Sequence, residues 1–187
     1  CNDFVLSINY KKNMIKAYFD EIEKDYQLSY IEEVNPLGTG GSLYYLKGDV
    51  KDTFFISNCD ILLDVDYEDV YRKHKNDQNK ITIITSLNQY TIPYGVINTN
   101  HNGEVDSISE KPSLNYLINT GVYVFEPDVL KYICEDKFMH ITELIDSCIL
   151  KGIKVGTYPI SENSWMDMGQ FNDLEKMKNR LQEEIDG

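Results

Sequence analysis

The sequence predicts an α/β fold, with a mostly parallel, mixed sheet flanked by helices and an antiparallel insertion. Short runs rich in β-branched and aromatic residues alternate with segments whose apolar residues repeat at the spacing of a helix. The alternation breaks once, where residues 94–98 and 104–109 flank the turn His101-Asn102-Gly103, a pattern typical of an antiparallel hairpin. At 187 residues, 42% of them hydrophobic, the chain is long enough to bury the core of one domain.

The expected elements follow one another along the chain. Strands are expected at residues 4–9, 29–34, 53–57, 80–85, 118–125 and 154–160. Helices are expected at residues 14–22, from near 42, at 66–76, at 141–149 and from about 170. The run 53–57 is the most apolar, so we expect it to be a central strand.

The charge balance excludes some functions. A net charge of −13 argues against nucleic-acid binding, which needs a basic surface. No apolar run approaches the roughly 20 residues of a membrane helix, and no basic-then-apolar export signal opens the chain. Four cysteines without a C-x-x-C pair indicate reduced thiols in the cytoplasm. An acidic protein that binds phosphates must supply positive charge locally, through a metal ion, lysines or backbone N–H groups.

Two aspartates follow apolar strands in different halves of the sequence. Asp60 comes shortly after the strand at 53–57, and Asp167 follows the strand at 154–160. Because ligands bind at the carboxyl ends of strands in open α/β sheets, the two side chains are expected to converge there. Paired carboxylates suit a hard divalent cation, which in turn suits a phosphate. A lone aspartate in such a place is more often a turn or cap residue.

A glycine-rich turn spans residues 36–42. It contains Gly38, Gly40 and Gly41, lacks the lysine of a P-loop, and has Leu43 where a dinucleotide-binding loop has its last glycine. One interpretation is a simple turn before a helix. The other is close approach of the backbone to a flat ligand such as a base, which residues without Cβ permit.

Three short motifs in the second half carry polar side chains or glycines. Gly95 begins the hairpin, Glu110 and Lys111 end it, and Asn119 and Gly121 lie in the next strand. Taken singly, Glu110 and Lys111 are typical of a surface ion pair. Asn119 and Gly121 taken singly indicate no more than a strand irregularity. Together they could instead contact a sugar and its phosphate.

Asp64-Val65-Asp66 forms a D-x-D motif. This motif binds metal in glycosyltransferases, but here it directly precedes the helix expected at 66–76. We therefore expect Asp64 or Asp66 to cap that helix.

In this order, the motifs resemble those of the sugar-1-phosphate nucleotidyltransferases, and the turn is most similar to mannose-1-phosphate guanylyltransferase-like members. The resemblance spans nearly the whole chain. It implies a glycosyltransferase-A-like, Rossmann-like α/β fold for residues 1–187, as the C-terminal part of a longer domain. It also implies an enzyme that joins a sugar 1-phosphate to a nucleoside triphosphate, with GTP favoured, to give an NDP-sugar and pyrophosphate.

The resemblance also implies roles for individual residues. Mg²⁺ would be held by Asp60 and Asp167, and these two residues with Lys111 would be catalytic. The base and the sugar would be bound by Gly38, Gly40, Gly41, Gly95, Glu110, Asn119 and Gly121. Nucleic acid and membranes are not expected as partners, and a homo-oligomer is left open.

The chain departs from the family at its beginning. The family starts with a glycine-rich loop that bears an arginine, followed by a lysine, and nothing before Phe4 supplies these groups. The isolated chain is therefore expected to bind triphosphate poorly, to turn over little, and to expose sheet edges. Two other functions stay open: a non-catalytic regulatory module that binds nucleotide-sugar, and a glycosyltransferase that uses Asp64 and Asp66.

Overall fold

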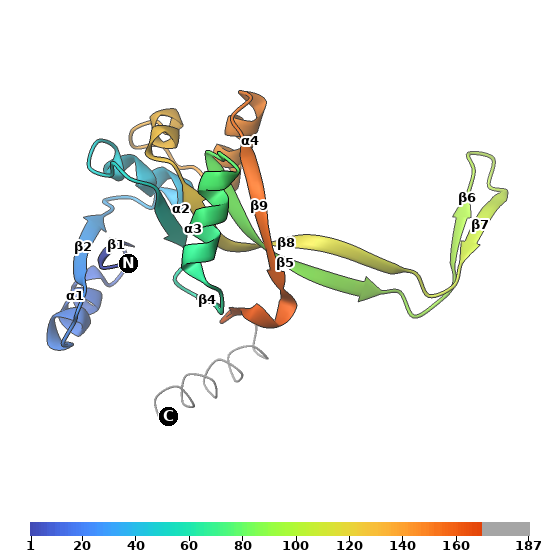
Figure 1. Ribbon diagram of the computed structural model, residues 1–187, viewed down its shortest axis with the longest axis horizontal. Coiled ribbons are helices and arrows are strands. Elements are labelled where there is room, and N and C mark those ends of the chain that lie inside the picture. The colour runs from blue at the N-terminus through green and yellow to red at the C-terminus, as the bar shows by residue number, and fades with distance from the viewer. Residues whose placement is uncertain (170–187) are drawn as a thin grey trace. The chain divides into compact units, whose positions relative to one another are not determined.

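The computed structural model describes residues 1–169 (Figure 1), and contacts within the chain divide it into two compact units. The first comprises Cys1–Phe54, Gln78–Ile81 and Phe125–Val155. The second comprises Phe55–Asp77, Thr82–Val124 and the residues from Gly156. The α/β class with a mixed sheet flanked by helices is confirmed, but the described strands form four sheets rather than one. The helix expected from about residue 170 lies outside the described residues.

The first unit contains two strands and several short helices. Its elements are β1 (Asp3–Ile8), α1 (Lys12–Glu21), β2 (Gln27–Glu32), α2 (Gly38–Gly41), the 3₁₀ helices η1 (Ser42–Leu46) and η2 (Pro127–Tyr132), and α4 (Ile141–Leu150). β1 and β2 pair in parallel. The helix expected from near residue 42 is only the single short η1, which ends before Gly48 takes a φ of 95°.

The second unit is built on a four-stranded sheet. Its elements are β3 (Phe54–Ser57), β4 (Ile61–Leu63), α3 (Tyr67–Asn76), β5 (Ile81–Thr91), β6 (Val96–Thr99), β7 (Val105–Ser109), β8 (Ser113–Phe125), β9 (Val155–Ser161), η3 (Glu162–Ser164) and β10 (Trp165–Asp167). The sheet has the order β3-β8-β5-β9, and its strand ends Phe54, Ile81, Phe125 and Val155 fall in the first unit. The expectation that β3 is central is wrong among the described strands, where β3 lies at one edge of this sheet.

The core of the second unit is apolar and lies against the sheet. The cluster consists of Leu63, Val70, Ile84, Val122, Val124 and Ile160, with Trp165 and Phe55 packed against it. His74 is fully buried nearby, and its Nδ1 lies 2.7 Å from the Thr82 hydroxyl. The His74 ring therefore serves as a hydrogen-bonding partner for the buried Thr82 hydroxyl.

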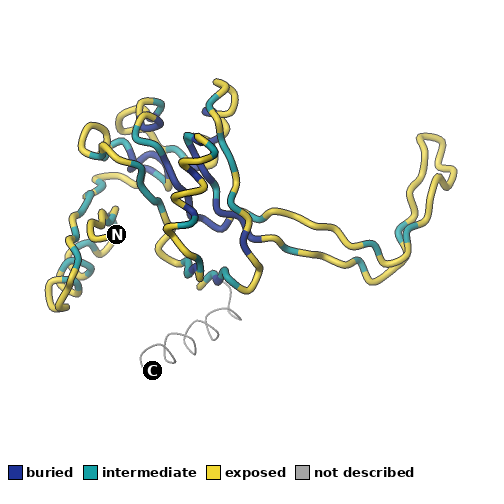
Figure 2. The backbone as a smooth tube through the Cα atoms, in the orientation of Figure 1, coloured by how far each residue is buried: buried dark blue, intermediate teal, exposed yellow. Residues whose placement is uncertain are grey.

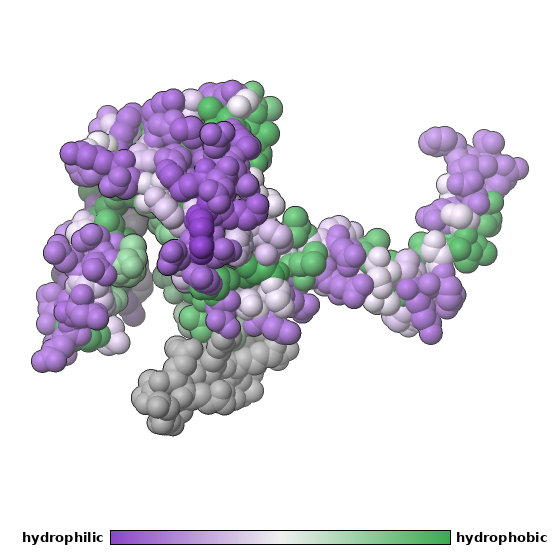
Figure 3. All heavy atoms as spheres, viewed as in Figure 1, coloured by the Kyte–Doolittle hydropathy of each residue, from purple (hydrophilic) through white to green (hydrophobic). Residues whose placement is uncertain are grey.

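β5 and β8 extend well beyond the sheet and run in opposite directions (Figure 1). We call residues 87–117, which include the β6–β7 hairpin, the arm. Both strands are buried where they lie in the sheet and exposed along the arm (Figure 2). Apolar residues lie among the polar ones on the arm (Figure 3). The exposed apolar residues of the arm are Leu87, Tyr90, Tyr94, Ile97, Val105, Ile108, Leu114, Tyr116 and Leu117.

The helix expected at 66–76 is confirmed as α3, and its cap is resolved. The Asp66 carboxylate accepts hydrogen bonds from the backbone N–H groups of Glu68 and Asp69, at 2.9 and 3.2 Å. The second aspartate of the D-x-D motif, Asp66, therefore caps the N-terminus of α3.

Replacing Asp66 by alanine should lower the free energy of unfolding by about 1 kcal/mol, because two N–H groups at the start of α3 lose their acceptor. Urea unfolding followed by circular dichroism measures the change. Asp66→Asn, which keeps a capping oxygen, should lose much less. Equal losses in the two variants would contradict the cap.

None of the helices within residues 1–169 is long and apolar enough to cross a membrane.

Candidate functional site

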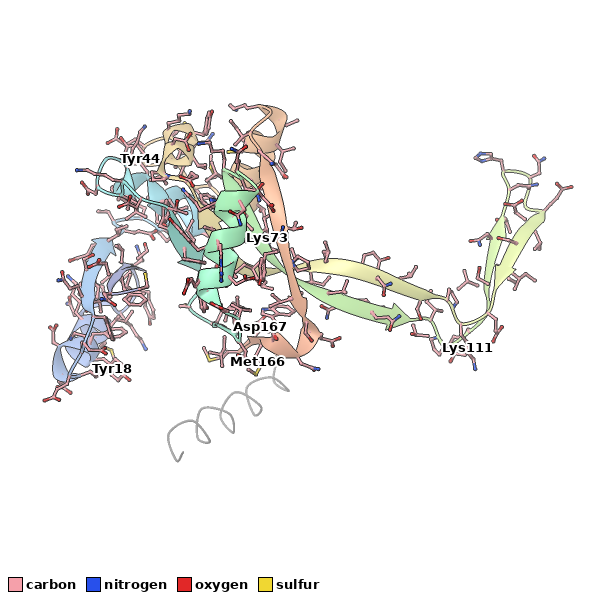
Figure 4. The ribbon with its side chains drawn as sticks, in the orientation of Figure 1. Tyr18, Tyr44, Lys73, Lys111, Met166 and Asp167 are labelled. Atoms are coloured by element: carbon pink, nitrogen blue, oxygen red, sulfur yellow. The ribbon has the colours of Figure 1, made fainter. Side chains whose placement is uncertain are left out.

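Asp60 and Asp167 are brought together by two short strands of the second unit. β10 pairs antiparallel with β4, with Asp167 opposite Ile61. The backbone N–H of Met168 donates to the carbonyl oxygen of Asp60 at 2.9 Å. Asp60 lies in the turn between β3 and β4 and is exposed, whereas Asp167 is half-buried on β10. Asp167 is labelled in Figure 4. The backbones of the two aspartates are thus adjacent, through a β4–β10 pair that the sequence did not predict, and the convergence of their carboxylates stays a prediction.

The surroundings of the pair suit one kind of metal ion. Asp167 Oδ1 accepts a hydrogen bond from the backbone N–H of Gly169 at 2.8 Å, which fixes one of its oxygens. Within residues 1–169, no three histidine, cysteine or acidic side chains gather as a metal site would require. Mg²⁺ typically takes one or two protein carboxylates and completes its shell with waters and substrate phosphates. The donor set therefore fits Mg²⁺ shared with a phosphate better than a metal held by protein alone.

Asn58 joins this region to the strand that carries Asn119 and Gly121. The Asn58 backbone N–H donates to the carbonyl oxygen of Gly121 at 3.0 Å. Gly121 has a φ of 82°, and a Cβ there would lie 2.7 Å from Asn58 Nδ2. Only glycine fits this crossing, which holds the start of the Asp60 turn against β8. Asn58 directly precedes Cys59 and Asp60 in the sequence, and this position was the only signal that could have indicated it.

The Asn119 side chain is partly engaged within its own strand. Its Oδ1 accepts from the Gly121 backbone N–H at 3.0 Å, and its Nδ2 donates to the Tyr123 hydroxyl at 2.8 Å. An amide group has two donor hydrogens and two acceptor lone pairs, so half of its capacity is left for a ligand.

Gly95, Glu110 and Lys111 lie together on the arm. The pairing of Val96 with Ser109 places Gly95 beside Glu110, and a Cβ on Gly95 would lie 3.1 Å from Glu110 Oε2. Lys111 adopts a φ of 44°. Figure 4 shows Lys111 far along the arm and well separated from Asp167. The grouping of Lys111 with the two aspartates is therefore not found, because β5 and β8 carry Lys111 outward beyond the sheet.

The glycine-rich turn belongs to the first unit and packs against its own chain. The backbone N–H groups of Gly40 and Gly41 both donate to the Met139 carbonyl, at 2.9 and 3.1 Å. The Met139 N–H in turn donates to the Leu37 carbonyl at 2.9 Å. A Cβ on Gly41 would lie 2.5 Å from the carbonyl oxygen of Lys137. The close approach that explains these glycines is thus to the backbone of residues 137–141, and contact with a base stays a prediction.

The same turn fixes the start of α4. The Ile141 backbone N–H donates to the Thr39 hydroxyl at 3.0 Å, and the His140 N–H donates to Glu143 Oε2 at 2.7 Å. A Cβ on Gly38, whose φ is 74°, would lie 2.7 Å from the Met139 carbonyl oxygen. Thr39 was not selected from the sequence, and a threonine inside a glycine-rich run was its only signal.

Acidic side chains hold two tyrosines of η1 in the first unit. The Tyr45 hydroxyl donates to Asp136 Oδ1 at 2.7 Å. This hydrogen bond, followed by burial, raises the pKa of Tyr45 above its usual value. Burial and a hydrogen bond to Glu135 raise the pKa of Tyr44 in the same way. Both hydroxyls are therefore neutral at physiological pH, and the carboxylates beside them give this surface a negative charge.

The comparisons with known proteins agree with the motifs. Residues 1–184 match the protein family described as Nucleotidyl transferase. The chain is 31% identical over 180 residues to the mannose-1-phosphate guanylyltransferase catalytic subunit beta of Dictyostelium discoideum, covering 92% of this chain and 50% of the relative. It is 29% identical over 181 residues to the mannose-1-phosphate guanyltransferase of Hypocrea jecorina, covering 92% of this chain and 49% of that relative. The chain thus spans about half the length of the curated relatives it matches.

Solved structures share the fold. HddC from Yersinia pseudotuberculosis has a TM-score of 0.68 at 22% identity, covering 96% of this chain and 79% of that one. The structure of HddC in complex with GMP-PN has a TM-score of 0.66 at 21% identity, covering 95% of this chain and 77% of that one. Because the family match covers nearly the whole sequence, the chain belongs to the nucleotidyl transferase family.

Proposed function

We propose that this chain is the C-terminal part of a longer nucleotidyltransferase domain that joins a sugar 1-phosphate to a nucleoside triphosphate, with GTP the favoured donor. The observation that carries the proposal is the β4–β10 pair, which sets Asp167 beside the Asp60 turn in a chain of the nucleotidyl transferase family. The guanylyltransferase relatives support guanine as the base. The protein would act in the cytoplasm on small phosphorylated substrates.

In the proposed reaction, a phosphate oxygen of the sugar 1-phosphate attacks the α-phosphorus of the triphosphate in line. The bond from that phosphorus to the β-phosphate oxygen breaks, and pyrophosphate leaves with the bonding electrons. Such a reaction requires positioning and charge neutralisation more than covalent work by the protein.

The two aspartates would carry the cation that the substrates need. Asp60 and Asp167 would hold Mg²⁺, which would neutralise charge on the reacting phosphates in a protein whose own net charge is −13. The hydrogen bond from the Gly169 N–H holds Asp167 Oδ1 in place. Because both oxygens belong to one planar carboxylate, the same hydrogen bond also limits the direction of the second oxygen.

Other residues would bind the sugar and the base. Asn119, with half of its hydrogen-bonding capacity unused, would donate to and accept from sugar hydroxyls close to Gly121. The Glu110 carboxylate, close to Gly95, would accept hydrogen bonds from sugar hydroxyls. Lys111 would supply a point charge to the sugar phosphate, which requires the arm to bring it to Asp60 and Asp167. The turn that contains Gly38, Gly40 and Gly41 would lie on the base side.

The glycosyltransferase alternative loses its main support in the structure. Asp66 directs its carboxylate to two backbone N–H groups at the start of α3, so one acid of the D-x-D motif is already used within the protein. The regulatory module differs from the enzyme in turnover alone, so an activity assay separates the two.

A direct assay tests the proposed function. The full-length product of the gene is incubated with Mg²⁺, each nucleoside triphosphate in turn and mannose 1-phosphate or glucose 1-phosphate, and pyrophosphate release is followed. We expect the fastest release with GTP, together with GDP-sugar, and at least about 100-fold less from the 187-residue chain alone. Nucleotide-sugar binding without pyrophosphate release from any pair would favour the regulatory module instead.

A further inference from the structure

The turn of the β6–β7 hairpin contains the only asparagine of the chain that is followed by glycine, Asn102-Gly103. The hairpin lies at the outer end of the arm (Figure 1), and both residues are exposed. A Cβ built on Gly103 would have no other atom within 4 Å. The peptide unit between Asn102 and Gly103 is therefore open to solvent.

Asn102 differs from the other two asparagines of the hairpin because its side chain is not held. Asn98 Nδ2 donates to the Ser107 hydroxyl at 3.0 Å. Asn100 Nδ2 donates to Glu104 Oε2 at 2.9 Å, and Asn100 Oδ1 accepts from two backbone N–H groups. Within residues 1–169, no hydrogen bond joins the Asn102 side chain to another group. Its amide group can therefore turn towards the nitrogen of the next residue.

This arrangement suits a reaction within the chain. The Gly103 nitrogen loses its proton and bonds to Asn102 Cγ, and the side-chain nitrogen leaves as ammonia with the electrons of the broken C–N bond. Water then opens the cyclic imide at either carbonyl, which gives aspartate or isoaspartate. Because both reacting groups belong to neighbouring residues, the step needs no catalyst or redox partner. Asparagine is among the thermally labile residues, and glycine has no side chain to block the attack.

One hydrogen bond has to open before this reaction. The Gly103 N–H donates to the Asn100 carbonyl oxygen at 3.1 Å. A single hydrogen bond in an exposed turn contributes little net free energy, and turns of this kind open locally without unfolding the protein. The structure therefore slows the attack on Asn102 only slightly.

The hydrogen bonds of the turn depend on the length of its backbone. Asn100 Oδ1 accepts from the Glu104 N–H at 3.1 Å, and the Asn100 N–H donates to the Glu104 carbonyl at 3.0 Å. Isoaspartate at position 102 would add one carbon to the backbone, which moves Gly103 and Glu104 away from Asn100. β6 and β7 form a sheet of two strands by themselves, and such a hairpin is only marginally stable in water. Loss of the turn should therefore loosen both strands.

We propose that Asn102 is a site of spontaneous modification, and that its conversion to isoaspartate loosens the β6–β7 hairpin while the four-stranded sheet stays intact. The aspartate product instead keeps the backbone length and adds one negative charge two residues from Glu104. The modification needs only water, so it is independent of nucleotidyl transfer, which the pyrophosphate assay tests separately.

Peptide mass spectrometry of the full-length gene product tests the modification. The protein is incubated in mildly alkaline buffer, folded or unfolded in guanidinium chloride, and isoaspartate is separated from aspartate by chromatography of the peptides. We expect Asn102 to lose its amide in the folded protein at a rate within about tenfold of the unfolded chain, since one hydrogen bond has to open. Asn98 and Asn100 serve as internal controls and should stay intact.

The proposal is wrong if Asn102 survives in the folded protein while the unfolded chain converts. It is also wrong if Asn98 or Asn100 converts as fast as Asn102, or if the folded protein yields no isoaspartate.

Amide hydrogen exchange tests the loosening of the hairpin. In the isoaspartate form, the amides of β6 and β7 should exchange about tenfold faster, whereas the Ile84 amide in the four-stranded sheet should not change. Freshly purified Asn102→Asp is the matched control, because it carries the new charge on a backbone of unchanged length. Equal exchange in the modified and unmodified proteins would overturn the proposal, as would equal loosening in Asn102→Asp.

Discussion

Replacing Asp167 by asparagine is expected to lower kcat/KM for nucleotidyl transfer by the full-length protein on the order of 10²–10³-fold. The substitution preserves the size of the side chain and the hydrogen bond from the Gly169 N–H, but it removes the negative charge that would hold the cation beside Asp60. The loss should therefore appear in activity, with little change in the unfolding midpoint. Pyrophosphate release at several Mg²⁺ concentrations measures it.

Asp146→Asn is the matched control, since it removes the same charge from an exposed position on α4. Its kcat/KM should stay within about twofold of the unmodified protein, because exposed charges contribute little across a distance in salt. If Asp167→Asn retained full activity at every Mg²⁺ concentration, the assignment of Asp167 to the cation would fail.

Replacing Gly41 by alanine is expected to destabilise the chain by about 1–3 kcal/mol, as overpacking typically does. The new Cβ would lie 2.5 Å from the Lys137 carbonyl oxygen and 3.1 Å from the Leu37 Cβ, so the turn or the 137–141 segment must move. Moving either segment would strain the hydrogen bonds that the backbone N–H groups of Gly40 and Gly41 donate to the Met139 carbonyl. Urea unfolding of the 187-residue chain measures the loss.

Gly95→Ala provides the comparison for this stability measurement. The nearest atom to its added Cβ is the carboxylate oxygen of Glu110, the end of a flexible side chain, at 3.1 Å. The carboxylate can move aside, so the unfolding free energy should change by less than about 0.5 kcal/mol. Equal effects at the two glycines would contradict the role of the turn in holding the start of α4.

Local patterns in the sequence predicted most of the elements. The β6–β7 hairpin and α3 with its Asp66 cap follow from residues within a few positions of one another, and both are present. The predicted position of β3 was wrong. Its apolar composition indicates an interior strand, whereas among the described strands only β8 pairs with it. Strand length was also underestimated, since β5 and β8 continue past the buried residues into the exposed arm.

The sequence suggests candidate site residues, but it does not determine how they are arranged. Asp60 and Asp167 were expected to converge, but the β4–β10 pair that joins them involves strands of only three residues each, too short for a periodic pattern. The glycines of the turn could indicate either a ligand or a packed backbone, and only the contacts with residues 137–141 distinguish the two. The separation of Lys111 from Asp167 depends on the course of the arm, which no local pattern encodes.

The central claim is that Asp60 and Asp167 together hold a divalent cation beside the nucleotide. Its most direct test is anomalous diffraction from crystals of the full-length protein grown with GTP and Mn²⁺ in place of Mg²⁺. The account predicts an anomalous peak in contact with carboxylate oxygens of both aspartates and with phosphate oxygens of the nucleotide. A manganese peak on the bound nucleotide that touches neither aspartate would contradict it.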